Sequence, residues 1–369
     1  MIERRTLITG GLGLVALAAC GGGEDAPSPG AFSSDVPTTP TTEPPIDPRI
    51  AGTVASGLNV PWGIAFTAGG AAFVSQRDTG VIVRIDGESE GAAVEPVGEV
   101  PGVALTPGSG EGGLLGLAVD PADDDVLFAY FTTAQDNRIV RFDLSGGTLG
   151  SPTPILTGIP KANTHGGGRL LFDADGHLLV ASGDAQQAPQ AQNPDSPLGK
   201  ILRIDTEGRP APGNPDGTAV WSLGHRNVQG LAFDADGRLW VSEFGQNTFD
   251  ELNLIRPGGN YGWPEVEGTG GTGDQIDPAV TWATEDCSPA GLGITRSTAF
   301  VAALRGRCVW AVPLQGELAG EPQRLFAGEL GRVRNATVTP GGDLWISTSN
   351  TDGRGDPSGE DDRILRVTL

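Results

Sequence analysis

Lysine, long apolar runs and helical periodicity are nearly absent from this 369-residue chain. Lysine occurs only at Lys161 and Lys200. The chain contains 24 basic and 46 acidic residues, which gives a formal net charge of −22. A charge of this sign makes nucleic acid and anionic membrane surfaces poor partners, and we expect neither. No apolar run is long enough to span a bilayer permanently, and beyond the extreme N-terminus no window keeps a helical period, which argues against a helical fold.

The first 20 residues are similar to an export signal. Arg4 and Arg5 precede a short apolar stretch, as in a twin-arginine signal. The stretch ends in Leu-Ala-Ala-Cys, which resembles a bacterial lipobox whose cysteine, here Cys20, is lipidated after cleavage. We therefore expect residues 1–20 to be a lipoprotein export signal; the alternative is an uncleaved anchor helix.

A polar segment follows this signal. Residues 21–48 contain mainly Gly, Pro, Ser, Thr and acidic side chains, with almost nothing to bury, and such a composition predicts a disordered linker. The folded domain would then comprise residues 49–369. We expect it to be exported and held only by its lipid anchor at the outer face of the bacterial cell membrane, or to be periplasmic.

Cysteine is also scarce, with three residues in the chain. Lipidation of Cys20 leaves Cys287 and Cys308. An exported chain meets an oxidising compartment, so we expect a disulfide between these two, whose loop of about 20 residues would contribute ~3 kcal/mol in a chain-entropy model. Two free buried thiols are the alternative, and metal binding is disfavoured because no histidine is near the pair.

Glycine and proline, by contrast, are abundant, with 58 and 29 residues, which fits many turns and few helices. Six stretches repeat one pattern: a small residue, an apolar segment, an Asp/Gly turn, an apolar-aromatic segment and a third strand. Asp-Gly supplies the positive φ of a tight hairpin turn. The repeats begin at Pro61, Gly113, Gly166, Asn227, Ser288 and Val333.

The spacing of these repeats, roughly 45 to 60 residues, is typical of four-stranded propeller blades. We predict an all-β fold: a six-bladed β-propeller of four-stranded antiparallel blades. Six equal units argue against a β-sandwich or a β-helix. Because a propeller leaves two open edges unless its ends pair, residues 50–56 should pair with the blade that ends at Leu369. Functional groups should then converge at one end of the central channel.

Histidine occurs three times, and one position suits catalysis. His165 precedes a predicted strand, and three glycines follow it and would expose its imidazole. Because imidazole titrates near neutrality, a histidine at a channel mouth suits a general base; a structural role is the alternative. His177 lies in a hairpin turn, which favours an exposed residue without a catalytic role.

Arginines recur near the starts of the inner strands. Arg226 stands beside Asn227, and Arg332 and Arg334 are placed on one side of a strand by its alternation. Arg305 lies in a hairpin of the fifth repeat. Singly, each would be a surface or ion-pair residue. Their recurrence at equivalent blade positions predicts that they converge on one anionic ligand.

Six motifs carry a resemblance to the soluble quinoprotein glucose dehydrogenase and aldose sugar dehydrogenase family, which includes glucose/sorbosone dehydrogenase-like proteins. In order, they are GEGGLLGLAVDP, THGGGRLLFDADGHLLVASGDA, PLGKILRID, LGHRNVQGLAFD, DELNLIRPGGNYGWP and GRVRNATVTPGGDLWIST. The resemblance covers essentially the whole folded domain, and the motifs together are highly specific. It implies a six-bladed propeller that binds pyrroloquinoline quinone (PQQ) and calcium at the channel mouth.

The resemblance also implies roles for individual residues. His165 matches the catalytic base that takes the proton from the sugar C1 hydroxyl, and Asp184 matches the acidic residue paired with it. Arg226 and Asn227 match the pair that lies over the quinone, where the arginine polarises its carbonyls. Glu111 falls at a substrate-side position. Arg332 and Arg334 match the pair that holds the carboxylates of the quinone. Arg305, a further cofactor-binding position, stands where the family usually has lysine, so the charge is kept but the geometry is not.

Two calcium sites are implied as well. The backbone carbonyls of Gly245 and Gln246 match the ligands of the catalytic calcium, and Glu251 and Tyr261 match a second, structural site. Ligation by oxygen alone suits this ion. The family commonly has a polar residue followed by Gly-Pro in this loop, so Phe244 and Gln246 replace a polar side chain and a rigid proline.

The resulting hypothesis is an oxidoreductase that uses PQQ and calcium to oxidise aldose sugars at C1 to lactones, with hydride passing from the sugar to the quinone. The sequence does not specify the sugar or the electron acceptor. Two alternatives remain: a non-enzymatic propeller that binds sugars or proteins, and a calcium-dependent propeller lactonase. The presence of His165 and the arginines favours the dehydrogenase, and no inner ring of Glu, Asn and Asp ligands is evident at the blade starts.

Overall fold

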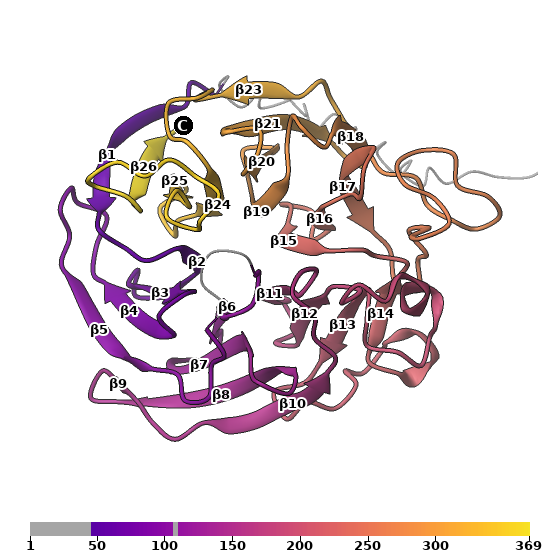
Figure 1. Cartoon of the computed structure of the whole chain (residues 1–369), viewed down its shortest axis with the longest axis horizontal. Coiled ribbons are helices and arrows are strands. Elements are labelled where there is room, and N and C mark those ends of the chain that lie inside the picture. Colours follow the sequence, from indigo (N-terminus) through magenta and orange to yellow (C-terminus); the bar gives the residue numbers. More distant parts are fainter. Residues whose placement is uncertain (1–45, 106–109) are drawn as a thin grey trace, which may run out of the picture. The chain divides into compact units, whose positions relative to one another are not determined.

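The structure, a computed structural model, describes residues 46–105 and 110–369, and these residues form a ring of six β-sheets (Figure 1). The expected export signal 1–20, its lipidation site Cys20 and nearly all of the expected linker 21–48 lie outside the described residues. Within the described ranges no helix is both long and apolar enough to cross a membrane. The predicted all-β, six-bladed propeller is confirmed.

Each blade has four main antiparallel strands, and one strand of each blade lies beside the central axis (Figure 1). This innermost strand is given first for every blade below. From the inside outward, the first three blades are β2 (Pro61–Phe66), β3 (Ala72–Gln76), β4 (Val81–Ile85), β5 (Val94–Glu99); β6 (Leu114–Asp120), β7 (Asp123–Thr132), β8 (Asn137–Ser145), β10 (Thr153–Ile159); and β11 (Gly167–Phe172), β12 (Leu178–Ser182), β13 (Lys200–Ile204), β14 (Val220–Leu223).

The other three blades are β15 (Val228–Phe233), β16 (Leu239–Glu243), β17 (Phe249–Ile255), β18 (Val280–Ala283); β19 (Pro289–Thr295), β20 (Thr298–Ala303), β21 (Cys308–Gln315), β23 (Gln323–Leu325); and β24 (Val333–Val338), β25 (Leu344–Thr348), β26 (Ile364–Thr368), β1 (Arg49–Ala55). The short elements are β9 (Thr148–Leu149), β22 (Leu318–Ala319) and the 3-10 turns η1 (Ala188–Gln192) and η2 (Pro215–Gly217).

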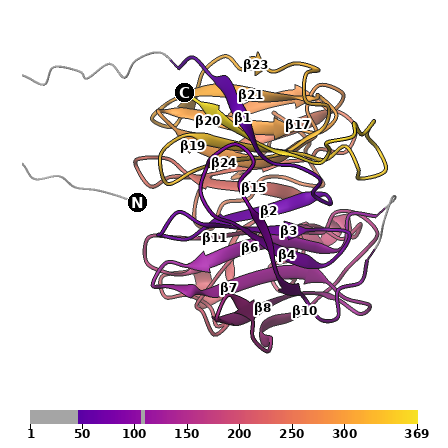
Figure 2. The same ribbon diagram turned by 90° about the vertical axis from the view of Figure 1, so that its left-hand side faces the viewer.

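The two ends of the folded domain close the ring together. β1 is the outer strand of the last blade and pairs antiparallel with β26, with Arg49 opposite Thr368 and Ala55 opposite Ile364 (Figure 1). Figure 2 shows the C-terminal end of the chain close to β1. The pairing predicted for residues 50–56 is therefore confirmed. Closure of this kind leaves neither end of the repeat array as an open edge that could pair with another chain.

Six apolar clusters hold the ring together, one at each interface between neighbouring blades. β12 illustrates how the sequence builds them, because successive side chains of a strand point to opposite faces. Leu178 and Val180 pack into the cluster shared with the second blade, whereas Leu179 and Ala181 pack into the cluster shared with the fourth. Both faces of the strand are buried, which explains its continuous apolar run.

Small and hydroxyl side chains set how closely the inner strands approach. A Cβ on Gly116 would lie 2.1 Å from the carbonyl oxygen of Gly168 in the next blade, so a larger residue would push the two blades apart. Ser75 of the first blade donates a hydrogen bond of 2.6 Å to the carbonyl of Leu115 in the second. Such contacts fix the ends of the inner strands, where the functional groups lie.

The expected disulfide is not formed. Cys287 and Cys308 are two free thiols, both buried in the apolar cluster between the fourth and fifth blades. Burial raises the pKa of each thiol above its usual value, so neither readily becomes the thiolate that disulfide formation requires. The two cysteines act as small apolar side chains of the core, which is the alternative that the sequence left open.

Candidate active site

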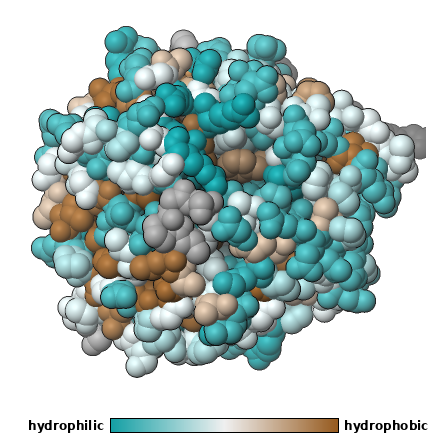
Figure 3. Space-filling view, in the orientation of Figure 1, coloured by the Kyte–Doolittle hydropathy of each residue, from teal (hydrophilic) through white to brown (hydrophobic). Residues whose placement is uncertain are grey.

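A polar cavity of about 210 Å³ lies at the end of the channel where the inner strands begin. Its charged lining consists of Glu111 and five arginines from the first, fifth and sixth blades: Arg77, Arg305, Arg332, Arg334 and Arg354. The space-filling view in Figure 3 shows mainly hydrophilic residues around a central hollow on one face of the ring. An excess of guanidinium groups over carboxylates in so small a space favours an anionic ligand.

His165, two residues before β11, lies between a carboxylate and a guanidinium. Its Nδ1 is 2.8 Å from Asp184 Oδ1, and its Nε2 is 2.8 Å from Arg226 Nη2. A carboxylate can only accept a hydrogen bond and a guanidinium can only donate one, so Nδ1 carries the ring proton and Nε2 keeps its lone pair. The surroundings thus fix the tautomer in which Nε2 can accept a proton.

The backbone at His165 is held in a left-handed conformation, with φ of 61°. Its N–H donates to Glu111 Oε2 at 2.9 Å, which joins His165 to the arginine-lined cavity. A Cβ on Gly183 would lie 1.9 Å from the carbonyl oxygen of His165. The His165 side chain is only 15% exposed. Glycine near His165 therefore allows the neighbouring backbone to pack closely against it, and the imidazole is mostly buried instead of exposed as expected.

Arg226 connects His165 to the loop between β16 and β17. Its Nε donates to the Gln246 side chain at 2.9 Å, and its Nη1 donates to the carbonyl of Phe244 at 3.1 Å. Burial lowers the pKa of Arg226, and nearby carboxylates, of which Asp184 has the largest effect, oppose this change. All three guanidinium nitrogens therefore have fixed partners, so the charge next to His165 is held in one place.

Trp263, in the loop between β17 and β18, contacts both partners of His165. Its Nε1 donates to Asp184 Oδ2 at 2.9 Å, and its ring centre lies 5.5 Å from the guanidinium carbon of Arg226. Its carbonyl oxygen accepts a hydrogen bond of 2.7 Å from Gln192. Trp263 therefore fixes the orientation of the carboxylate that selects the histidine tautomer.

Arg332 and Arg334 share one carboxylate. Arg332 donates to Asp352 Oδ2 through Nε at 3.0 Å and Nη2 at 2.9 Å, and Arg334 Nη2 lies 3.8 Å from the same oxygen. Burial, and then the neighbouring Arg77 guanidinium, lowers the pKa of Arg334 to about 9. Its Nε has no hydrogen-bond partner among the described residues. A buried, partly unpaired cation of this kind is suited to a ligand that carries carboxylates.

The other predicted cofactor and substrate residues lie at the same end of the channel. Asn227 Nδ2 is 3.4 Å from Glu111 Oε2, and its Oδ1 accepts a hydrogen bond from the N–H of Gly167 at 3.1 Å. Arg305 is exposed at the rim of the cavity, in the turn between β20 and β21. Predicted residues that are up to 223 positions apart in the sequence (Glu111 to Arg334) thus meet in one site.

The segment that carries the predicted calcium ligands, residues 244–249, is called the calcium loop below. Its N–H groups are hydrogen-bonded to other parts of the protein, and the carbonyls of Gly245 and Gln246 remain available. The N–H of Gly245 donates to Asp250 Oδ1 at 2.9 Å, and that of Gln246 donates to Glu267 Oε1 at 2.7 Å. Four such bonds hold the pKa of Glu267 below its ordinary value against the effect of burial, which would raise it. No described residue donates a hydrogen bond to the carbonyl oxygens of Gly245 or Gln246, and oxygen ligands of this kind suit calcium.

The predicted structural calcium ligands Glu251 and Tyr261 line a second cavity, together with Gly245. Its volume of about 10 Å³ is close to what one water or ion occupies. Burial, and then the neighbouring Glu243 carboxylate, raises the pKa of Glu251. The Tyr261 hydroxyl donates to the Leu254 carbonyl at 2.7 Å. The carboxylate-rich surroundings fit a cation.

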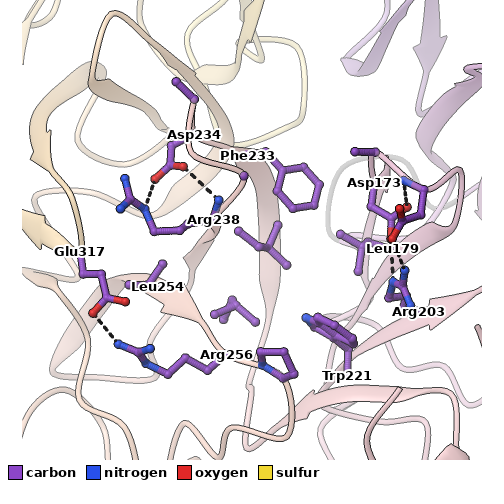
Figure 4. A pocket seen from close by; sticks show the side chains of 17 residues that line it. Asp173, Leu179, Arg203, Trp221, Phe233, Asp234, Arg238, Leu254, Arg256 and Glu317 are labelled. Atoms are coloured by element: carbon purple, nitrogen blue, oxygen red, sulfur yellow. Dashed lines mark hydrogen bonds and ion pairs between the residues drawn. The ribbon is translucent and has the colours of Figure 1, made fainter. Parts of the chain in front are cut away.

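A larger cavity of about 610 Å³ lies at the opposite end of the third and fourth blades (Figure 4). Its charged residues are paired with one another, as in Arg203–Asp173, Arg238–Asp234 and Arg256–Glu317. Asp173, Asp175 and His177 are the one group among the described residues that brings three acidic or histidine ligand atoms together. The Arg203 guanidinium bonds to all three, so this group already holds a cation.

Comparison with known proteins agrees with this geometry. The family model described as Glucose / Sorbosone dehydrogenase matches residues 58–365. The chain belongs to this family. The family resemblance predicted from the motifs is therefore confirmed, and the protein is an oxidoreductase of the sugar dehydrogenase class.

Several sugar dehydrogenases are similar to this chain. The solved structure of the PQQ-bound form of an aldose sugar dehydrogenase from Streptomyces coelicolor is 48% identical, with a TM-score of 0.82, and the match covers 87% of this chain and 97% of that one. Aldose sugar dehydrogenase YliI of Escherichia coli K12 is 28% identical over 80% of this chain and 89% of its own. Quinoprotein glucose dehydrogenase B of Acinetobacter calcoaceticus is 32% identical, over 64% of this chain and 57% of its own length.

Three residues of this candidate site were missed by the sequence analysis: Arg77, Trp263 and Arg354. Arg77 directly follows the second strand of its blade, and Asp184 and Arg305 lie two residues after the second strands of theirs. This equivalent position in the repeat could have identified Arg77 as a residue of the site. Arg354 lies in the long β25–β26 connection, with its Nη1 3.8 Å from Glu111 Oε1. Nothing in the sequence indicated that Trp263 would reach the histidine pair from a loop.

Proposed function

We propose that this dehydrogenase oxidises aldose sugars at C1 to lactones, with PQQ and calcium as cofactors. One observation carries the proposal: the Nε2 lone pair of His165 is fixed beside an arginine-lined cavity. A base and an anion site side by side are what proton removal next to a carboxylated redox cofactor requires. The similarity to the PQQ-bound Streptomyces enzyme supports the same function.

The cavity fits the carboxylates of PQQ. Arg305, Arg332 and Arg334 would hold them, and the unpartnered Nε of Arg334 offers a donor for this purpose. Arg226 and Asn227 would lie over the ring, where a fixed guanidinium stabilises negative charge that develops on an oxygen. When bound, PQQ supplies the acceptor for the hydride that leaves C1.

The residues around His165 then have separate tasks. The C1 hydroxyl would replace the contact of Arg226 Nη2 with His165 Nε2 and give its proton to that nitrogen, while the bonds to Gln246 and Phe244 keep the guanidinium in place. Asp184 would stabilise the resulting imidazolium through Nδ1, as a buried carboxylate does for a general base. Glu111, which lines the cavity, would accept a hydrogen bond from another sugar hydroxyl.

Calcium would be held next to this site. The carbonyl oxygens of Gly245 and Gln246 are available to the catalytic ion, and Glu251 and Tyr261 line the cavity proposed for the structural one. A divalent cation there would polarise a bound carbonyl as a Lewis acid. It would also offset the charge of the buried carboxylates on this side of the fourth blade.

The direct test is reconstitution of the purified protein with PQQ and calcium, followed by a screen of aldoses with an artificial electron acceptor. We expect PQQ to bind at micromolar concentrations or below and aldose to be converted to lactone. Binding of sugar without turnover would instead identify a non-enzymatic binding propeller. Hydrolysis of lactones by the PQQ-free protein with calcium would identify a lactonase.

Changing Trp263 to phenylalanine should lower turnover about tenfold while the affinity for PQQ stays unchanged. The variant keeps an aromatic ring under Arg226 but removes the N–H that orients Asp184, and a hydrogen bond to a charged group contributes about 1.5–3 kcal/mol. The measurement is kcat of the reconstituted enzyme. Trp282→Phe, in which the lost N–H has no hydrogen-bond partner among the described residues, is the matched control and should keep wild-type turnover. Equal turnover of the two variants would contradict the role given to Trp263.

We further propose that residues 1–20 direct export, that Cys20 carries the lipid and that residues 21–48 tether the catalytic domain 49–369. The start of β1 at Arg49 supports the last boundary. We expect Cys20→Ser to release the enzyme from the membrane fraction of the producing cells without changing kcat. Retention of the variant in the membrane fraction would contradict lipid anchoring.

A further inference from the structure

We infer that Glu267 positions the calcium loop of this enzyme, an inference that rests on the calcium site proposed above. The calcium loop, residues 244–249, comprises the connection from β16 to β17 and Phe249, the first residue of β17, whereas Glu267 lies in the later connection between β17 and β18. Glu267 is partly buried: it lines the small cavity proposed for the structural calcium, and its carboxylate is bonded to the loop. Its role would be to hold the ligands, as a positioning residue.

A single oxygen of Glu267 binds four consecutive peptide groups. Its Oε1 accepts hydrogen bonds from the N–H groups of Gln246 at 2.7 Å, Asn247 at 2.9 Å, Thr248 at 2.8 Å and Phe249 at 3.1 Å. Successive N–H groups that converge on one anion form a nest, and each bond is strengthened by the carboxylate charge. The carboxylate therefore fixes four peptide planes at once.

Two of these peptide planes carry the proposed calcium ligands. The N–H of Gln246 and the carbonyl of Gly245 belong to one peptide unit, and the N–H of Asn247 and the carbonyl of Gln246 belong to the next. In a trans peptide the N–H and the carbonyl point in opposite directions. By drawing both N–H groups toward itself, Glu267 turns the carbonyl oxygens of Gly245 and Gln246 to the other side of the loop.

The remaining N–H groups of the loop are tied down as well. Phe244 donates to the carbonyl of Asn227 at 3.2 Å, and Gly245 donates to Asp250 Oδ1 at 2.9 Å. With all six N–H groups directed to protein acceptors, the loop has no alternative hydrogen bonds to which it could relax. The side of the loop that remains for a ligand is the carbonyl side.

Glu267 also compensates for the residue at position 246. A proline there would restrict φ through its ring but would have no N–H to donate. Gln246 lacks that restriction and offers an N–H, and Glu267 makes its shortest bond to it. The rigidity that proline would give through covalent geometry is thus supplied by a hydrogen-bonded carboxylate.

The test measures calcium binding to the PQQ-free protein by calorimetry, so that no activity assay is involved. Glu267→Gln removes the charge, and Glu267→Asp keeps the charge but shortens the side chain by one methylene. We expect both variants to bind calcium at least tenfold more weakly than wild type. The amide oxygen in Glu267→Gln accepts N–H bonds without the charge that strengthens them, and the shorter side chain in Glu267→Asp cannot reach all four N–H groups. Glu265→Gln removes an equal charge two residues away, from an exposed side chain bonded to Gln275, and should bind calcium like wild type.

Amide hydrogen exchange provides the second readout. We expect the amides of residues 246–249 to exchange faster in both Glu267 variants, while those of the β15–β16 ladder keep wild-type protection and show that the blade is folded. Wild-type calcium affinity in Glu267→Asp would overturn the inference, since it would mean that charge alone matters. Unchanged exchange of residues 246–249 would overturn it as well. Failure of the wild-type protein itself to bind calcium would instead refute the calcium site on which the inference rests.

Discussion

Replacement of His165 with alanine should lower the turnover of the reconstituted enzyme by about 10²- to 10⁴-fold. The variant removes the nitrogen whose lone pair is fixed by Asp184 and Arg226. The other histidine at this end of the channel, His225, is fully buried, and both of its ring nitrogens are bonded, to Ser222 and Glu243, so it cannot replace His165. The arginines that line the proposed cofactor cavity are untouched, so the affinity for PQQ should remain close to that of wild type. The measurements are kcat with an aldose and an artificial acceptor, and an absorbance titration with PQQ in the presence of calcium.

His177→Ala is the control for this change. His177 lies at the opposite end of the third blade, where it contacts Arg203, and its removal should leave turnover unchanged. A His165→Ala enzyme with wild-type turnover would show that another group takes the proton, even though the family assignment would stand. Loss of PQQ binding in the same variant would place His165 in cofactor binding instead of catalysis.

Replacement of Arg332 with alanine should have the opposite pattern, with PQQ affinity about tenfold to 150-fold lower. A charge-assisted hydrogen bond contributes roughly 1.5–3 kcal/mol, and tenfold in affinity corresponds to about 1.4 kcal/mol. Turnover at saturating PQQ should change far less, because Arg332 lies on the arginine side of the site and has no contact with His165. Absorbance titration gives the affinity, and kcat at saturation separates the two effects.

The ion pair of Arg332 calls for a second variant. Arg332→Ala leaves the buried Asp352 without its closest cation, and an unpaired buried charge costs about 3–5 kcal/mol of stability. In the double variant Arg332→Ala/Asp352→Asn this charge is removed, so thermal unfolding should return toward wild type while PQQ affinity stays low. Recovery of PQQ affinity in the double variant would show that Arg332 acts only through the fold.

Much of the site was predictable because residues at equivalent positions of the repeats lie at the same end of a propeller. His165, Arg226 and Arg332 each stand just before an inner strand of their blade, and inner strands begin at the same end of the channel. Recognition of the six repeats was therefore enough to predict that these residues converge. Residues on irregular connections had no such rule: Trp263 and Glu267 lie in the β17–β18 connection, and nothing in their sequence spacing indicates what they contact.

The predicted bond between the cysteines failed for a similar reason, because it depends on tertiary packing. Their spacing and the expected export favoured a bond between Cys287 and Cys308, but the structure buries both as free thiols in an apolar cluster. Spacing along the chain does not specify whether two side chains face each other with the geometry that a disulfide needs. That depends on how the fourth and fifth blades pack.

The sequence by itself determined the architecture, the ring closure and the family, because each depends on local patterns. A short apolar inner strand, a hairpin turn and a buried second strand repeat six times, with Asp-Gly in the turn of the third and fourth copies, and this repeat specifies the blades. Only the tertiary structure decided the tautomer of His165, the unpaired Nε of Arg334 and the direction of the Gly245 and Gln246 carbonyls. The reason is physical: these properties depend on which donor or acceptor, brought from another blade or loop, lies within about 3 Å, the length of a hydrogen bond.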